Sequence, residues 1–269
     1  MTPAGRTTLA VDVGGTGIKA SVLDNRGEPT AERVRVATTY PMDPDHLVDV
    51  VADLAGRLPA YDRISVGFPG VVREGRILTA PHFVTEKGPG TREVPALLHR
   101  WSGFDLAGVL ESRLGKPTRV ANDADLQGAA VVTGKGLEMV VTLGTGVGTA
   151  LFYNGSLAPH LELAHHPFRR DETYNEQIGD AARRRIGKRR WNKRVHLAIR
   201  TLHDLVLYDH LYIGGGNSAR VSPPLDDNVT VVDNAAGILG GIKLWETDSL
   251  GLPGPKKAAP KATRPLTGR

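Results

Sequence analysis

The sequence predicts an α/β protein made of two related domains with a cleft between them. Apolar runs bounded by turn residues predict a strand, a glycine loop and a second strand over Leu9–Val13, Gly14–Gly17 and Ile18–Leu23. The same order returns about 130 residues later, where Val140–Leu143 precedes the glycine loop Gly144–Gly148. A repeat of strand, loop and strand is typical of a duplicated unit, and the cleft between two such units is a common binding site.

The remaining elements alternate between helices and strands, as expected for the α/β class. Apolar spacing predicts, in chain order, a helix at His46–Arg57, a strand at Arg63–Val66, a helix at Leu106–Leu114, a strand at Thr118–Ala121, a helix at Leu126–Val132, a strand at Tyr208–Ile213 and a last helix at Ala235–Trp245. We expect an N-terminal domain over residues 1–124 and a C-terminal domain over 125–252, with the last helix, near 235–246, packing back on the N-terminal domain. The Pro- and Lys-rich tail, 253–269, is expected to be disordered.

Composition restricts the chemistry of the site. The 269 residues include 32 Gly and no Cys, which excludes disulfides, thiol nucleophiles and Cys-ligated zinc or iron–sulfur centres. The N-terminus has no apolar signal segment, and the longest weakly polar stretch, Met139–Tyr153, is too short to span a bilayer. We therefore expect a cytoplasmic protein that does not bind membranes.

The two glycine loops are candidate phosphate sites. Gly15–Ala20 formally matches the dinucleotide pattern, but β-branched residues and a turn follow it where that motif requires a helix. The P-loop pattern fails at Gly134–Gly136, because Gly follows the Lys. Either loop alone could be a plain hairpin turn, but successive backbone N–H groups also bind phosphate. Asp12 would then face a bound Mg²⁺, while Thr16 and Thr145 would donate hydroxyl hydrogen bonds.

A pair of acidic residues follows a short strand in Asn122–Asp125. Asn or Asp at this place can be an ordinary helix cap. Alternatively, one carboxylate is a general base that accepts a proton from a sugar hydroxyl during phosphoryl transfer. Composition alone does not choose between Asp123 and Asp125 for this role.

Glu162 and His165 lie just after the second repeat. Without Cys or an H-E-x-x-H motif, a zinc site is not expected here. Both side chains can accept hydrogen bonds from vicinal sugar hydroxyls. The alternative is a surface salt bridge between this pair and Arg169 or Arg170.

Several of these motifs, taken together, resemble those of the ROK family of sugar kinases, which has the hexokinase/actin-like (ribonuclease H-like) two-domain fold with a duplicated βββαβα-type unit. The motifs are Val11–Thr16, Asn122–Ala124, Leu143–Gly148, Glu162 with His165, and Ile213–Gly216. Three further segments are similar to the members of this family that use polyphosphate: Leu161–Phe168, Gly187–Asn192 and Tyr208–Asn217.

The resemblance implies transfer of a terminal phosphoryl group from polyphosphate or ATP to the 6-hydroxyl of glucose. Asp123 would be the catalytic base, and Mg²⁺, held by Asp12 directly or through water, would accompany the donor. The sugar would contact Gly70, His82, Asn122, Glu162 and His165. The phosphates would contact Asp12, Gly14, Gly15, Thr16, Lys19, Gly144, Thr145, Gly146, Gly214, Gly215 and Gly216. Family members are commonly homodimers.

Two departures from the family pattern leave the hexose open. Ala164 stands where Gly is usual between the Glu and the His, and His82 stands where a sugar-binding Asn is common. Mannose or another hexose therefore remains an alternative to glucose, and a strictly ATP-dependent kinase remains an alternative to a polyphosphate-dependent one.

The net charge of +5 is unevenly distributed. Arg183–Arg194 holds eight basic residues and no acidic one, the tail from Pro253 holds five more, and the rest of the chain is acidic. The segment could be a solvated helix face, a nucleic-acid patch or a track for the polyphosphate donor. Only Trp191 offers base stacking, so nucleic acid is the weakest interpretation. The expected track comprises Lys188, Arg189, Arg190, Lys193 and Arg194.

Two other classes of function compete with a kinase. A ROK-type transcriptional regulator would need a DNA-binding domain before the first strand, which is expected to begin at about Thr8. A non-catalytic sugar sensor would not need Asp12 and Asp123, which are both present.

Overall fold

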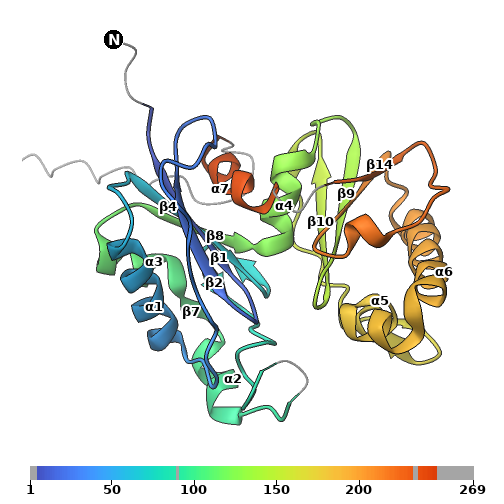
Figure 1. The fold of residues 1–269 in the computed structure, drawn as a ribbon, viewed down its shortest axis with the longest axis horizontal. Coiled ribbons are helices and arrows are strands. Elements are labelled where there is room, and N and C mark those ends of the chain that lie inside the picture. Colours follow the sequence, from blue (N-terminus) through green and yellow to red (C-terminus); the bar gives the residue numbers. More distant parts are fainter. Residues whose placement is uncertain (1–4, 89–90, 233–235, 247–269) are drawn as a thin grey trace, which may run out of the picture.

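A computed structural model describes residues 5–88, 91–232 and 236–246, and shows two five-stranded sheets side by side (Figure 1). In the first sheet the spatial order is β3 (Val34–Val36), β2 (Ile18–Leu23), β1 (Thr8–Val13), β4 (Arg63–Phe68) and β8 (Thr118–Asn122). The pairs β3–β2 and β2–β1 are antiparallel, whereas β1–β4 and β4–β8 are parallel.

The second sheet repeats this arrangement. Its order is β11 (Ser156–Leu157), β10 (Val147–Tyr153), β9 (Leu137–Leu143), β14 (His210–Gly214) and β15 (Val229–Val231). Again the first two pairs are antiparallel and the last two are parallel. The same strand order and the same strand directions confirm the internal duplication that the glycine loops predicted.

The two glycine loops differ by one residue in length. Val13 pairs with Ile18 across a four-residue loop, whereas Leu143 pairs with Val147 across a three-residue loop. The spacing between the two copies, about 130 residues in the sequence, is therefore 130 before the loops and 129 after them. The chain forms the same hairpin twice, with a tighter turn in the second copy.

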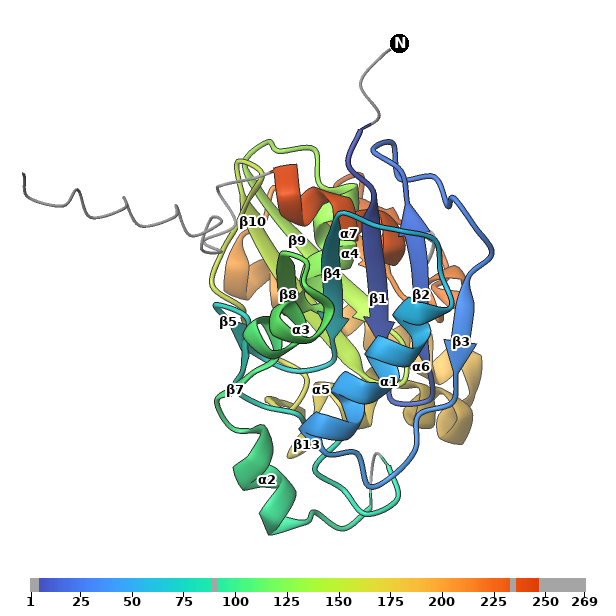
Figure 2. The same cartoon turned by 90° about the vertical axis from the view of Figure 1, so that its left-hand side faces the viewer.

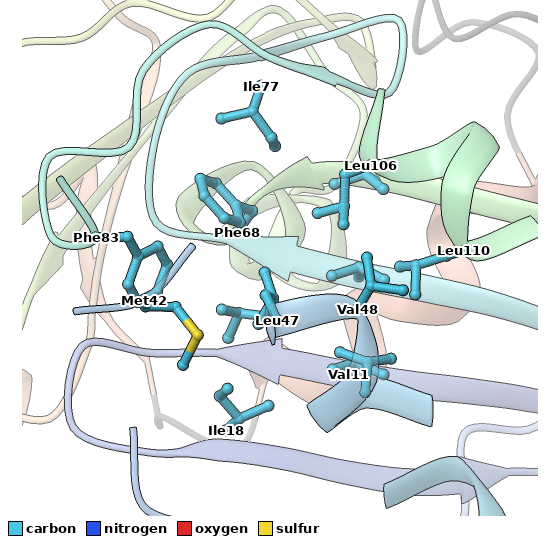
Figure 3. Close-up of a cluster of buried hydrophobic side chains, with 14 of the residues drawn as sticks. Val11, Ile18, Met42, Leu47, Val48, Phe68, Ile77, Phe83, Leu106 and Leu110 are labelled. Carbon is cyan, nitrogen blue, oxygen red and sulfur yellow. The ribbon is translucent and has the colours of Figure 1, made fainter. Parts of the chain in front are cut away.

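Helices α1 (Pro44–Gly56) and α3 (Leu106–Leu114) cover one face of the first sheet (Figure 2). Between the sheet and these helices lies a core of aliphatic and aromatic side chains that include Val11, Leu47 and Phe68, all buried (Figure 3). The short helix α2 (Pro95–Trp101) and the small sheet of β5 (Val72–Arg73), β6 (Arg76–Ile77) and β7 (Phe104–Asp105) extend this core. Trp101 closes it by donating from Nε1 to the Met42 carbonyl, 2.9 Å away.

Two helices, α4 (Asp123–Val131) and α7 (Ala236–Glu246), lie side by side between the sheets (Figure 1). They cross so closely that a Cβ on Gly240 would lie 1.8 Å from the carbonyl oxygen of Leu126. As expected, α7 packs back on the first sheet, where the Ser65 hydroxyl donates to the Gly241 carbonyl at 2.6 Å. The predicted start of α4 at Leu126 was wrong by three residues, because Asn122 caps the helix.

The second sheet packs against α5 (Tyr174–Ile178) and the long helix α6 (Asp180–Val206). Small strands β12 (Pro167–Arg169) and β13 (Glu172–Thr173) precede α5. Trp191 is fully buried and donates to the Ile178 carbonyl, which joins the two helices. At Gly187, φ is 75° and ψ is 162°, so α6 is interrupted by a kink at a position that glycine adopts readily.

Two further expectations from the sequence concern the C-terminal tail and membrane-spanning helices. The predicted disordered tail, 253–269, lies outside the described residues. Across the ranges that the structure describes, no helix combines the length and apolarity needed to cross a membrane.

Candidate active site

A cleft of about 230 Å³ lies where the loops after β1, β9 and β14 meet the first turn of α4. Most of the residues predicted for the site line it. They are Asp12, Gly14, Gly15, Thr16, Lys19, Gly70, His82, Asn122, Asp123, Gly144, Thr145, Gly146, Glu162, His165, Gly215 and Gly216. Gly214 and the five basic residues of α6 are not among its lining residues.

The first glycine loop is held in place by the segment that follows β3. The Gly14 amide donates to the Gly17 carbonyl at 3.1 Å, which closes the turn. Thr38 and Tyr40 then donate from their hydroxyls to the carbonyls of Gly14 and Gly15, each at 2.6 Å. These bonds fix the loop before any ligand binds. Thr38 and Tyr40 were not expected from the sequence, because no motif links them to the loop.

Asp12 and Lys19 form an ion pair on the wall of the cleft, with 3.0 Å between Oδ2 and Nζ. The Asp12 side chain is 43% exposed, so one carboxylate oxygen can take a further ligand. Magnesium in kinases is commonly held by one or two carboxylates together with substrate phosphates and water. Within the described ranges no group of three or more His, Asp or Glu is arranged as a metal site, so Asp12 fits only this substrate-assisted kind of binding.

The second glycine loop is held by α5 and by the start of α6. The Gly144 amide donates to the Gly146 carbonyl at 2.9 Å, and the Val147 amide donates to Oδ1 of Asn175 at 2.7 Å. Asp180 donates its backbone N–H to the Gly144 carbonyl at 3.2 Å. Asn175 is therefore a site residue that the sequence analysis missed.

Gly215 brings the loop after β14 against the second glycine loop. Its φ is +85°, and a Cβ there would lie 2.6 Å from the backbone nitrogen of Leu143. Both facts require glycine, because an L side chain would be strained and would collide with backbone. Gly215 therefore completes the cleft by close backbone packing, and Gly216 lines the cleft beside it.

Asn122 serves as the N-cap of α4. Its Oδ1 accepts from the amides of Ala124 at 2.8 Å and Asp125 at 3.4 Å, and its Nδ2 donates to the Gly70 carbonyl at 2.9 Å. The side chain is buried, and both ends of its amide are engaged within the protein. The helix-cap interpretation is thus correct for Asn122, although the residue also borders the cleft.

Asp123, the first residue of α4, lies in the cleft and accepts from the Ala124 amide at 2.9 Å. Burial raises the pKa of its carboxyl to about 7, and the negative charges of Asp12, Asp125 and Glu162 add to this effect. Asp125 is different: it is buried outside the cleft lining, and its Oδ1 lies 3.2 Å from Nδ1 of His160. Of the two carboxylates that composition could not separate, only Asp123 is in a position to meet a ligand in the cleft.

The opposite wall carries Glu162, His165 and His82. Oε1 of Glu162 accepts from the Ala164 amide at 2.9 Å. Burial would raise the pKa of Glu162, but the nearby His160, 3.6 Å away, and the hydrogen bond from the Ala164 amide outweigh it and hold the pKa below its usual value. Burial, with a smaller contribution from His165, lowers the pKa of His82. Its buried Nδ1 has no hydrogen-bond partner in the described part of the chain.

The predicted basic track divides between two faces of α6. Lys188, Arg189 and Lys193 line a separate groove, which is completed by Asn192, His196, Arg200, Ser222 and Pro223. Arg194 instead donates to the Gln177 carbonyl at 3.4 Å; burial and the nearby Arg169, Arg185 and Arg170 lower its pKa. Within the described ranges none of the five track residues has a carboxylate at ion-pair distance.

Two sheets of the same strand order that share one glycine-lined cleft form the actin-like hexokinase fold that the ROK sugar kinases have. The chain belongs to the ROK family, whose sequence profile matches residues 8–160. The resemblance seen in the sequence motifs is thereby confirmed.

The chain is similar over most of its length to polyphosphate-using relatives. It is 27% identical over 256 residues to a polyphosphate glucokinase of Mycobacterium tuberculosis (strain CDC 1551 / Oshkosh), covering 87% of this chain and 89% of that protein. The crystal structure of an inorganic polyphosphate/ATP-glucomannokinase from Arthrobacter sp. strain KM superposes with a TM-score of 0.75 at 27% identity, covering 90% of this chain and all of that one. An N-acetylmannosamine kinase of Escherichia coli (strain SE11) is 31% identical over 157 residues, which is 56% of this chain and 49% of the relative.

Proposed function

We propose that this protein transfers a terminal phosphoryl group from inorganic polyphosphate, ATP or both to the 6-hydroxyl of glucose, which gives glucose 6-phosphate. One observation carries the proposal: Asp123, with its pKa raised to about 7, lies in the same cleft as both glycine loops and the Glu162–His165 wall. A carboxylate of this pKa can accept a proton at neutral pH and release it afterwards. The names of two relatives support this assignment: one is a polyphosphate glucokinase, and the other is a glucomannokinase that uses polyphosphate or ATP.

In this reaction the walls of the cleft have different roles. Glu162, His165 and His82 accept hydrogen bonds from sugar hydroxyls and orient the ring. The 6-hydroxyl oxygen then bonds to the terminal phosphorus while the bridging P–O bond to the donor breaks. The hydroxyl proton passes to the Asp123 carboxylate, and the leaving group is ADP or a polyphosphate shortened by one unit. General-base catalysis of this kind contributes about 10²–10⁴ in rate.

The glycine loops hold the donor phosphates through backbone amides, and Thr16 and Thr145 add hydroxyl donors. Asp12 would hold Mg²⁺, which supplies charge neutralisation for the donor phosphates when bound. Lys19, paired with Asp12, adds a positive charge on the same wall.

For a polyphosphate donor we propose that the chain leaves the cleft along α6. The second glycine loop bonds the first residue of α6, Asp180, so the helix begins at the donor site. From there Lys188, Arg189 and Lys193 line one groove along the helix, and Arg190 and Arg194 would extend the positive surface around it. None of the five has a carboxylate at ion-pair distance in the described part of the chain. Such a run suits an extended polyanion, whose binding releases counterions.

The test is sugar-phosphate formation with Mg²⁺, in which glucose, mannose, fructose, N-acetylglucosamine and N-acetylmannosamine are each combined with ATP and with polyphosphate. We expect glucose to be the best acceptor and polyphosphate to support turnover. If N-acetylmannosamine is phosphorylated faster than glucose, it is the substrate in place of glucose. If only ATP supports turnover, polyphosphate is not a donor. No turnover in any combination would favour a sugar sensor.

The matched variant is Asp123→Asn, which keeps the size of the side chain but removes the base. We expect kcat to fall by about 10²–10⁴ while calorimetry still shows sugar binding. A variant with near wild-type kcat would reject Asp123 as the base.

A further inference from the structure

His160 joins the helix of the proposed base to the segment that carries the proposed sugar ligand. Its side chain is only 5% exposed and lies between two carboxylates. Nδ1 lies 3.2 Å from Oδ1 of Asp125, in the first turn of α4, and Nε2 lies 3.6 Å from Oε2 of Glu162. The ring therefore bridges two segments that are 35 residues apart in the chain.

His160 carries the positive charge of this bridge, whereas burial raises the pKa of Asp125. Burial alone would lower the pKa of His160, but its contacts with Asp125 and Glu162 outweigh burial and raise the pKa to about 9. The imidazolium is the only side-chain hydrogen-bond partner of the buried Asp125 carboxylate in the described part of the chain. A buried carboxylate without a partner is costly, so Asp125 and His160 hold one another in place.

Other hydrogen bonds hold the segment around His160 in place. Thr149 of β10 donates its hydroxyl to the Leu161 carbonyl, and the Ala164 amide donates to Oε1 of Glu162. The Thr149 bond ties the segment to the second sheet, and the Ala164 bond orients Glu162 within the segment. Asp125 lies in α4, which packs against β9 and β10 of the same sheet. His160 supplies the side-chain hydrogen bond that joins the segment to α4.

We propose that His160 is a positioning residue for phosphoryl transfer: by joining Asp125 to Glu162 it fixes the sugar-binding carboxylate relative to Asp123. The proposal rests on the proposed function, because it takes Glu162 as a sugar ligand and Asp123 as the base. His160 itself touches neither the sugar nor the reacting atoms in this assignment.

The first test is His160→Leu, which removes the bridge and leaves Asp125 unpaired. We expect the KM for the sugar to rise about tenfold, as coupling within one hydrogen-bonded network predicts, while the KM for the donor stays within about twofold. In His160→Asn the amide nitrogen takes the place of Nδ1 and can still donate to Asp125, but the shorter side chain cannot reach Glu162. We therefore expect His160→Asn to keep Asp125 paired while its sugar KM stays about tenfold raised. A wild-type sugar KM in His160→Asn would overturn the proposal, since the contact with Glu162 would then have no role.

A second variant separates positioning from stability. Asp125→Ala combined with His160→Leu replaces both buried polar partners by apolar groups of similar summed volume, which restores stability in comparable cases. We expect the melting temperature of the double variant to recover relative to His160→Leu while the sugar KM stays about tenfold raised. If sugar affinity, measured by calorimetry without donor, recovers together with stability, His160 has only a structural role and the proposal is wrong.

His210→Leu is the matched control, because His210 lies at the end of β14 away from Gly214 and contacts Thr230 instead. Its sugar KM should equal that of the wild type. Failure of the proposed function would appear in the wild type itself, as absence of sugar turnover, and would refute this proposal as well. An active wild type with unaffected His160 variants would refute the positioning role alone.

Discussion

Tyr40 donates a hydrogen bond of 2.6 Å from its hydroxyl to the carbonyl oxygen of Gly15, in the first glycine loop. The ring of Tyr40 also stacks on Phe83, with 6.4 Å between centroids, and Phe83 is the neighbour of the proposed sugar ligand His82. One side chain thus contacts the donor loop and the core beneath the sugar wall.

Replacing Tyr40 by Phe removes the hydroxyl and keeps the stacking. We expect the donor KM to rise several-fold, because a net hydrogen bond of about 1 kcal/mol that orders the loop is lost. The sugar affinity should change little. Steady-state kinetics with each substrate varied in turn measures both effects, and Tyr61→Phe, at the edge of the same core, is the control. A change in sugar KM with an unchanged donor KM would contradict this prediction.

The raised pKa of Asp123 predicts the pH dependence of turnover. A base must be deprotonated to act, and a pKa of about 7 keeps Asp123 protonated in mildly acidic solution. We therefore expect kcat/KM to fall about tenfold per pH unit below pH 6 and to level off above pH 8. The residual rate of Asp123→Asn should lack this acidic limb. A wild-type profile that stays flat down to pH 5 would show that the carboxyl titrates at its usual value.

Neutralising Arg189, Arg190, Lys193 and Arg194 together tests the donor track. We expect the KM for polyphosphate to rise at least about tenfold and its dependence on salt to weaken, because each lost phosphate contact lowers the salt slope by about 0.7–0.9. The KM for ATP should stay within about twofold. Initial rates at several salt concentrations measure both effects.

Equal losses of activity with polyphosphate and ATP would show that this part of α6 is a solvated helix face and not a donor track. The control neutralises four exposed arginines from the first half of the chain, which gives the same change of net charge. This variant should affect the KM for polyphosphate no more than the KM for ATP. The four residues are Arg26, Arg57, Arg73 and Arg113.

We predict that Asn122 contributes more to the stability of the fold than to sugar affinity. Asn122→Ala removes the N-cap of α4 and the bond to the Gly70 carbonyl, so we expect the free energy of unfolding to fall by about 2–3 kcal/mol. Asn122→Ser should lose less, because serine still caps the helix. Urea unfolding measures the loss, and calorimetry with sugar measures affinity. A large loss of affinity in Asn122→Ser with unchanged stability would instead make Asn122 a direct sugar ligand.

The parts of the site that the sequence predicted depend on local patterns. The glycine loops could be found because each lies between two apolar strands, and the duplication made a chance match improbable. Asp123 could be proposed because it follows a strand and begins a helix. Separating it from Asp125 required the structure, since the two side chains differ only in which neighbours they face.

The residues that the sequence analysis missed act across long separations in the chain. Asn175 supports a loop that ends at Gly146, and His160 contacts Asp125, yet no spacing rule connects either pair. The basic residues of α6 illustrate a second limit. They form one run in the sequence, but helical geometry and the kink at Gly187 distribute them over more than one face.

The equal strand order of the two sheets also bears on how the cleft is built. Each sheet supplies one glycine loop to a shared cavity, so one copy of the unit alone would form only one half of it. Because both copies lie in one chain, their sequences can differ. The divergence is visible across the cleft: Asp12 precedes the first loop, and the corresponding place before the second holds the uncharged Thr142, whose hydroxyl accepts from Gly148. The two glycine loops therefore have different electrostatic surroundings, with a carboxylate before the first loop and a hydroxyl before the second.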